Sequence, residues 1–149
     1  MKPFDMPTLI FRLRQLAQPQ IVPISFHIEQ HRQNLEKEVI KQMSMLGVPA
    51  HYKGFIYLRE AIVMAVENSA IMDRMTKGLY PAIADKCNTS SHQVERAIRH
   101  AVEATWTKGN LKMIDELFAY TVDMEKGKPT NSSFIARLAD QVRVKNRAG

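Results

Sequence analysis

The sequence predicts an all-α protein: about six helices with an embedded helix-turn-helix, preceded by one further helix and a linker. Two observations carry this prediction. Apolar residues recur at three- and four-residue spacing in successive segments, and no segment sustains the alternation of a β-strand. With 149 residues, 45% of them hydrophobic, the chain is long enough for one domain with a substantial core.

The N-terminal part predicts a helix, a linker and a second helix. Residues 5–16 have the spacing of an amphipathic helix. Residues 17–27 hold two prolines and little periodicity, which is typical of a linker. A helix is then expected from about Ile28 to Leu46, with Ile28 at the start of its apolar face. Gly47 is expected to end it, because glycine accepts the left-handed conformation found there.

The same spacing predicts helices at about Gly54–Glu67, Ile71–Met75, Asn110–Phe118 and, after a cap at Thr130 or Asn131, toward the C-terminus.

Between these helices, residues 77–106 predict two short helices joined by a polar turn. The first is expected from about Tyr80 to Cys87, and the turn at 88–90 begins with an asparagine that tolerates positive φ. The second is expected over about 91–106, because Ser90 followed three residues later by Gln93 is a capping-box pattern. Gly109 is expected to end it in the left-handed conformation.

The second of these helices has one apolar and one charged face. The apolar stripe is Val94, Ile98, Ala101, Val102 and Thr105, and the opposite face carries Gln93, Glu95, Arg96, Arg99 and His100. Arginine can donate two hydrogen bonds to guanine, and glutamate can accept one from cytosine. We therefore predict a DNA-reading helix that enters the major groove. The alternative at this point is a solvated surface helix, which carries the same charges without a partner.

Phosphate contacts are expected around this helix. Its first backbone amides can hold phosphate together with Thr89, Ser90 and Ser91, while the cations expected to neutralise phosphate are Lys86, Lys108, Lys128 and Lys145. The net charge of +6 and the pI of about 9.6 fit a polyanionic partner. Part of this excess lies in residues 125–149, for which a solvated basic tail is an equal alternative.

Other classes of protein are not predicted. The single cysteine excludes an internal disulfide and suits a reducing compartment, and no apolar run is long enough to span a bilayer. Because charged residues interrupt the N-terminal apolar residues, no signal peptide is expected, and the predicted location is the cytoplasm. No metal-ligand set, cofactor motif or convergent catalytic group is present, so we expect no metal, no cofactor and no enzymatic activity.

Three segments closely resemble one known family. They are LGVPAHYKGFIYLREAI, LYPAIADKCNTSSHQVERAIRHAVEATWTKGN and KPTNSSFIARLADQVR, within about residues 44–146. They are similar to the effector domain of the sporulation-initiation response regulators of endospore-forming bacteria, the stage zero sporulation protein A family. The most specific motifs are VPAHYKG, YLREAI, VERAIRHA and KPTNS, in this order.

This resemblance implies a six-helix effector that reads a TGTCGAA-like box in double-stranded DNA and activates or represses genes of entry into sporulation. Glu95, Arg96 and Arg99 match the family's base-reading positions, and His100 lies beside them. Gln93 departs from the family, which commonly has arginine there, and this puts the target sequence in doubt. Two effectors are expected to bind tandem boxes as a homodimer.

The resemblance also implies a domain organisation. Residues 1–16 are similar to the last helix of a receiver domain, residues 17–30 would be a hinge, and residues 31–149 would be the effector. In the intact family protein a phosphorelay acts through the receiver. The phosphoacceptor aspartate is not among these residues, so DNA binding by this chain is expected not to depend on phosphorylation.

A contact with the sigma subunit of RNA polymerase is implied for the segment after Gly109. The matching positions are Lys112, Asp115, Glu116, Phe118 and Val122, with core packing as the alternative for Phe118. A different class of function also stays open. Because Gln93 replaces an arginine, the domain could be a protein-interaction module or decoy that has lost specific DNA reading.

Overall fold

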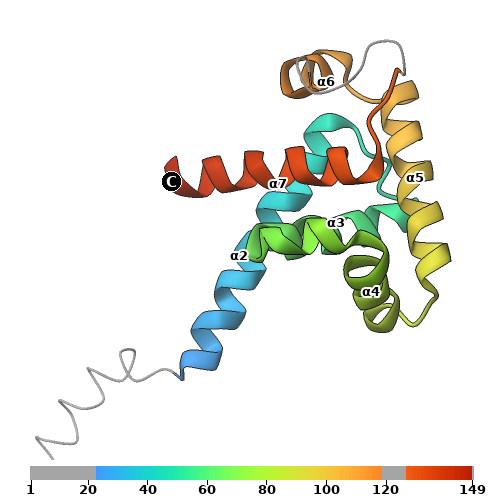
Figure 1. The fold of residues 1–149 in the computed structure, drawn as a ribbon. Helices are drawn as coiled ribbons and strands as arrows, with labels where there is room; N and C mark the ends of the chain where they lie inside the picture. Colours follow the sequence, from blue (N-terminus) through green and yellow to red (C-terminus); the bar gives the residue numbers. More distant parts are fainter. Residues whose placement is uncertain (1–22, 119–126, 149) are drawn as a thin grey trace, which may run out of the picture. The chain divides into compact units, whose positions relative to one another are not determined.

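The computed structural model describes residues 23–118 and 127–148, in which all regular structure is helical (Figure 1). This confirms the predicted all-α fold. The α-helices are α2 (Ile24–Leu46), α3 (Lys53–Glu67), α4 (Tyr80–Lys86), α5 (Ser91–Lys108), α6 (Leu111–Phe118) and α7 (Asn131–Ala148). Residues 1–22, with the expected receiver helix and the first part of the hinge, lie outside the described residues, as does Val122.

The chain divides into two units, Met1–Asn34 and Leu35–Gly149. In the described part of the first unit, α2 begins at Ile24, where the carbonyl oxygen of Pro23 accepts a hydrogen bond from the Phe26 amide at 2.9 Å. Proline's fixed φ suits the start of a helix. The linker expected over 17–27 and the hinge expected over 17–30 are therefore helical from Ile24 onward. Ile28, expected on the buried face, is 63% exposed.

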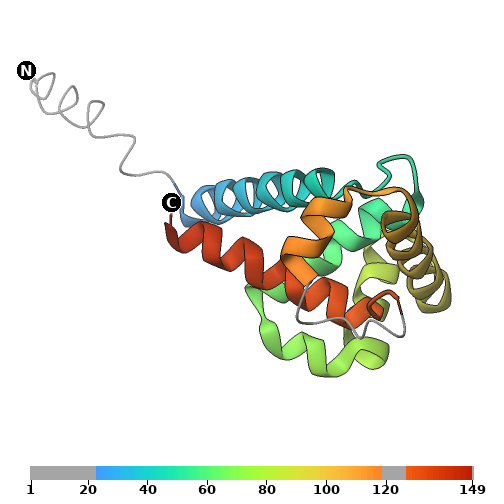
Figure 2. The same cartoon turned by 90° about the horizontal axis from the view of Figure 1, so that it is seen from above.

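The core of the second unit lies between α3, α5 and α7, which pack against one another. Figures 1 and 2 show α3 running beneath α7 with α5 across their ends. The interior is filled by side chains at the predicted helical spacing, including Val39, Met43, Phe55, Leu58, Ile62, Phe134, Leu138 and Val142. This core holds α5 by one face and leaves its other face exposed.

Two glycines join the end of α2 to the end of α5. Gly47 has φ +88°, as expected for a helix-ending glycine, and its amide donates to the Met43 carbonyl at 3.1 Å. Gly109 has φ −79°, so the predicted left-handed conformation is wrong there. Glycine is needed instead for close approach, because a Cβ would lie 2.6 Å from the Leu46 carbonyl oxygen.

The segment between α3 and α4 differs from the expected α-helix at Ile71–Met75. A 3₁₀-helix, Ser69–Arg74, is followed by a π-helical turn, Met75–Leu79. The Asn68 side chain begins the first by accepting a hydrogen bond from the Ala70 amide at 3.2 Å. A tight turn followed by a wide one shifts the helical phase, so that Leu79 enters the core directly before α4.

Candidate nucleic-acid interface

The helix-turn-helix consists of α4, a turn and α5, as the sequence predicts. Asn88 adopts φ +57° in the turn, and the Ser90 hydroxyl accepts a hydrogen bond from the Gln93 amide at 3.2 Å. The helix α5 continues to Lys108, two residues beyond its expected end. Its predicted apolar stripe is entirely buried: Val94, Ile98, Ala101, Val102 and Thr105.

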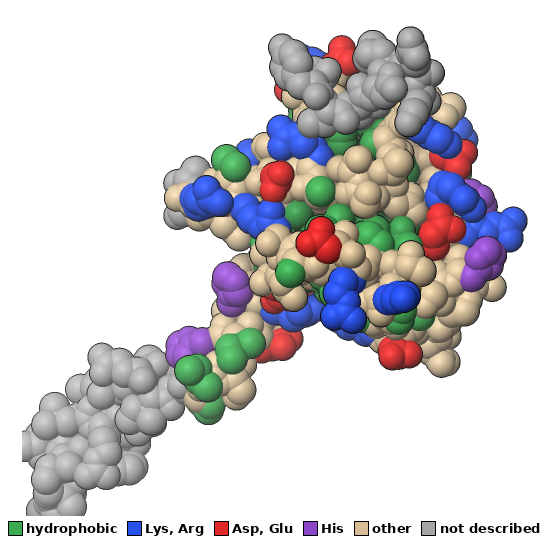
Figure 3. Space-filling model, viewed as in Figure 1, with side chains coloured by type: hydrophobic (Ala, Val, Ile, Leu, Met, Phe, Trp, Pro, Cys, Tyr) green, Lys and Arg blue, Asp and Glu red, His purple; other side chains and the backbone are tan. Residues whose placement is uncertain are grey.

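The other face of α5 gathers the predicted base-reading residues. The side chains of Gln93, Arg96, Arg99 and His100 are exposed, and Glu95 is half-buried at the edge. In Figure 3, basic and histidine side chains cluster over α5 with acidic ones among them. The structure therefore brings these positions together on one accessible helix face, which is the geometry a groove-binding helix requires.

An ion pair on this face holds one arginine. Arg99 Nη1 lies 3.5 Å from Glu95 Oε2, one helical turn away, and the two side chains are 50% and 32% exposed. At this exposure the pair contributes little stability. It does, however, restrict the directions that the guanidinium can take. Glu95 is therefore placed to orient Arg99.

The first turn of α7 fixes α4 and α5 relative to each other. The Asn131 amide group donates to the Tyr80 hydroxyl at 3.1 Å and to the Glu95 carbonyl oxygen at 3.2 Å. Burial raises the pKa of Tyr80, and the bond from Asn131 only partly offsets this, so the phenol stays neutral at physiological pH. Thr130 is the cap of α7, since its hydroxyl accepts from the Ser133 amide at 3.2 Å.

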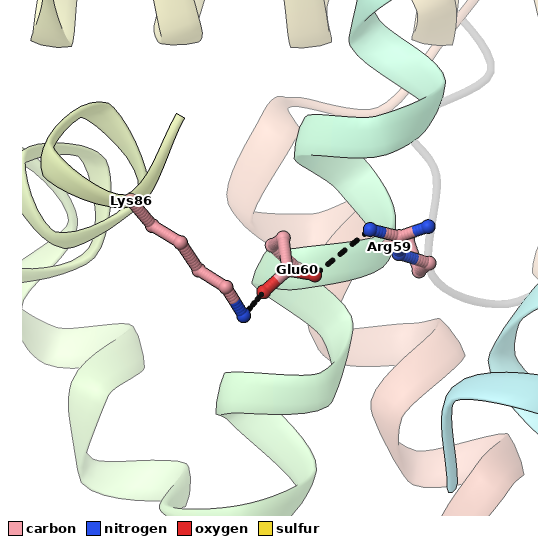
Figure 4. Close-up of polar contacts among 3 residues, drawn as sticks. All are labelled: Arg59, Glu60 and Lys86. Atoms are coloured by element: carbon pink, nitrogen blue, oxygen red, sulfur yellow. Dashed lines mark hydrogen bonds and ion pairs between the residues drawn. The ribbon is translucent and has the colours of Figure 1, made fainter. Parts of the chain in front are cut away.

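A buried carboxylate fixes α4 to α3 (Figure 4). Glu60 is 2% exposed, and its two oxygens lie 2.5 Å from Lys86 Nζ and 3.1 Å from an Arg59 guanidinium nitrogen. Burial alone would raise the pKa of Glu60. The hydrogen bonds and charges of Lys86 and Arg59 outweigh it and hold that pKa below its ordinary value.

The predicted phosphate contacts are not equally placed. Lys86 is engaged by Glu60, and Lys128 Nζ lies 3.2 Å from Glu103 Oε2. Lys108 is exposed in the last turn of α5. Lys145 is exposed near the C-terminal end of α7, which lies on the far side of the unit from α5 (Figures 1 and 2). The structure does not bring Lys145 together with the recognition helix.

Thr89, Ser90 and Ser91, at the start of α5, differ in the hydrogen-bonding groups that they leave for a phosphate. The Thr89 amide donates to the Ala84 carbonyl at 2.9 Å, so this amide is already used. The Ser90 hydroxyl is used as the helix cap. The Ser91 and His92 amides precede the first hydrogen bond within the helix and point outward along its axis.

In α6, Lys112, Asp115 and Glu116 are exposed, as a protein contact requires. Phe118 is 2% exposed and stacks on Phe134 with ring centroids 5.5 Å apart. Phe118 is therefore a core residue, and its predicted surface contact with polymerase is wrong. The apolar character of the aromatic ring decides its position.

Sequence reasoning missed two side chains that shape this surface. Nothing in the spacing of Glu60 links it to Lys86, which is 26 residues away and on another helix. Asn131 was considered only as a helix cap, whereas its bonds reach α4 and α5. A buried glutamate is costly unless it is paired. The position of Glu60 among the core residues of α3 was therefore the one sign in the sequence that it has a cationic partner.

Within residues 23–118 and 127–148, no group of three His, Cys, Asp or Glu side chains is arranged to hold a metal ion. None of the described helices is both long and apolar enough to cross a membrane.

The family model described as "Sporulation initiation factor Spo0A C terminal" matches residues 39–142. This range contains α3 to α6, most of α7 and every predicted base-reading residue. The matched family is one of DNA-binding regulatory domains and not of enzymes. The chain therefore belongs to the sporulation initiation factor Spo0A C-terminal family, as a DNA-binding effector domain of a sporulation response regulator.

Proposed function

We propose that this domain reads a TGTCGAA-like box by placing α5 in the major groove. The observation that carries the proposal is the single exposed face of α5, on which Gln93, Arg96 and Arg99 lie together above a fully buried stripe. A solvated surface helix would explain the charges. It would not explain a capped, rigidly packed second helix that presents them beyond a tight turn.

Within the groove, Arg96 and Arg99 donate to guanine O6 and N7. Glu95 orients Arg99 through the 3.5 Å pair and is also able to accept from cytosine. Gln93 stands in the first turn of α5, where a glutamine prefers adenine over the guanine that an arginine prefers. A change at one base pair of the box is the expected consequence.

Phosphate contacts then position the helix. The Ser91 and His92 amides, with the hydroxyls of Thr89 and Ser91, face the phosphate next to the helix start. Lys108, exposed in the last turn of α5, adds positive charge there, and Lys128 takes part if it leaves Glu103. Lys86 takes part if it leaves Glu60, and Lys145 contacts DNA only where a second effector or a bent duplex reaches it.

The wider regulatory role is part of the same proposal. Residues 1–16 would be the end of a receiver and 17–30 a hinge that is helical from Ile24, with the effector over 31–149. In the intact regulator a phosphorelay would control pairing on tandem boxes. Exposed Lys112, Asp115 and Glu116 on α6 would contact the sigma subunit of RNA polymerase.

Titration of a labelled duplex carrying TGTCGAA and of a scrambled duplex, each at two salt concentrations, tests this proposal. We expect tighter binding to the box at both concentrations, and binding that weakens steeply with salt on both duplexes. Equal affinity for the two duplexes would show that the domain does not read bases, and would contradict the proposal. The rival function, a protein-interaction module favoured by the Gln93 departure, would then account better for the domain.

A further inference from the structure

A hollow of about 310 Å³ lies beside the recognition helix, on the side of α3. It is lined by Tyr52, His100, Glu103, Ala104, Thr107 and Lys108. Tyr52 belongs to the turn before α3, whereas the other lining residues come from the second half of α5. No pattern in the sequence links Tyr52 to the DNA-reading surface.

The start of α3, next to Tyr52, packs closely on α5. A Cβ on Gly54 would lie 2.1 Å from the Ala97 carbonyl oxygen, so the first turn of α3 rests directly on the backbone of α5. Tyr52, two residues before Gly54, lines the same hollow as His100, which is one turn beyond Arg96 on the exposed face. The hollow therefore borders the residues proposed to read bases.

The chemistry of the lining suits an anion. Lys108 supplies a full positive charge, and the His100 ring and the Tyr52 hydroxyl are hydrogen-bond donors. The Thr107 hydroxyl donates to the Glu103 carbonyl oxygen at 2.9 Å. The one carboxylate in the lining, Glu103, has Lys128 Nζ at 3.2 Å, so a cation from outside the hollow balances its charge.

We infer that this hollow takes a backbone phosphate of the bound duplex, contacted by Tyr52, His100 and Lys108. The inference rests on the proposed docking of α5. A major groove about 12 Å wide closely fits a helix 10–12 Å across, so the flank of the inserted helix meets the phosphates at the groove edge. His100 then positions the helix on the backbone and does not read a base.

The test uses the full chain with Lys108→Gln and Tyr52→Phe, and with Lys37→Gln as a control that removes an exposed lysine from α2. Affinity is measured against salt on box and scrambled duplexes. Lys108→Gln should make the slope of log affinity against log salt shallower by about 0.9, as expected for one lost phosphate contact. The ratio of box to scrambled affinity should not change, and Lys37→Gln should leave the slope as it is.

A second measurement locates the phosphate. Box duplexes carry one neutral methylphosphonate at successive positions along the strands. At one position the methylphosphonate should weaken DNA binding by the wild-type protein. It should have little further effect on DNA binding by Lys108→Gln or Tyr52→Phe. The inference is overturned if Lys108→Gln behaves like Lys37→Gln, or if every methylphosphonate affects wild type and variants equally. A wild-type protein with no box preference would instead overturn the base reading, and the salt slopes would still decide the phosphate contact.

Discussion

Lys86 Nζ lies 2.5 Å from the Glu60 Oε1 oxygen and thereby ties the last turn of α4 to the middle of α3. Glu60 is almost fully buried, whereas Lys86 is half exposed. The pair stands where the first helix of the helix-turn-helix ends and its turn begins. The position of the turn, and with it the start of the recognition helix, therefore depends on a charge that water does not reach.

Removing the ammonium of Lys86 should destabilise the domain. In Lys86→Met the carboxylate of Glu60 stays buried and keeps the neighbouring Arg59. We expect a loss of about 1–3 kcal/mol in the free energy of unfolding, below the 3–5 kcal/mol typical when a buried partner is left alone. Urea denaturation measures it. Lys77→Met, at an exposed position before α4, is the control, and equal losses in the two variants would contradict the account.

The lowered pKa of Glu60 predicts a pH dependence of stability. A carboxyl group whose pKa is lower in the folded state contributes stability that is present above its unfolded-state pKa. That contribution is lost as the pH falls through the folded-state value. As the pH falls below about 5, the free energy of unfolding should therefore decrease less in Glu60→Gln than in the wild type. The difference in this decrease should be about as large as the stability that Glu60→Gln lacks at pH 7. Parallel pH profiles for the two proteins would show that Glu60 carries no such linkage.

Asn131 should matter for both fold and DNA binding, because it bonds to α4 and α5 together. Asn131→Ala removes two hydrogen bonds, and we expect a cost of about 1–3 kcal/mol. Tyr80→Phe removes one of the same bonds, so the double variant should cost less than the sum of the single ones. Thermal unfolding of the four proteins completes this cycle. Additive effects would mean that the Asn131–Tyr80 bond contributes nothing.

Gly54 should tolerate no side chain. The Cβ of an alanine would meet the Ala97 carbonyl oxygen at 2.1 Å and the Ala101 side chain at 2.8 Å, which forces α3 away from α5. Gly54→Ala should lose at least about 1–3 kcal/mol and bind the box more weakly. Gly78→Ala is the matched control, because its Cβ meets only side-chain atoms, at 3.1 Å or more. Unchanged stability in Gly54→Ala would contradict the close packing described here.

Helical spacing alone predicted the buried stripe of α5, because burial of one apolar face dominates the placement of an amphipathic helix. Local hydrogen-bonding chemistry predicted the Ser90 cap and the positive φ of Asn88. The Gly109 conformation could not be predicted, since the reason for glycine there is the Leu46 carbonyl, 63 residues earlier in the chain. The pairing of Glu60 with Lys86 depends likewise on how two helices meet.

The candidate site shows the same division. The charged face of α5 follows from spacing within one helix, so the sequence was sufficient to assemble Gln93, Arg96 and Arg99. Tyr52, from the turn before α3, and Asn131, from the first turn of α7, reach that surface only after folding. Phe118 likewise packs on Phe134 in the core, whereas its position in the family pattern had implied a surface contact with polymerase.

The central claim is that Arg96 reads a guanine through the major groove. The most direct measurement is the affinity of wild-type protein and Arg96→Ala for box duplexes in which each guanine in turn is replaced by 7-deazaguanine, which lacks the N7 acceptor. At one guanine, the replacement should weaken DNA binding by the wild type and leave binding by Arg96→Ala unaffected. The loss should be a part of the binding free energy of a bidentate contact, which is about 1–3 kcal/mol. If every replacement weakens both proteins equally, Arg96 does not read a guanine and the account is wrong.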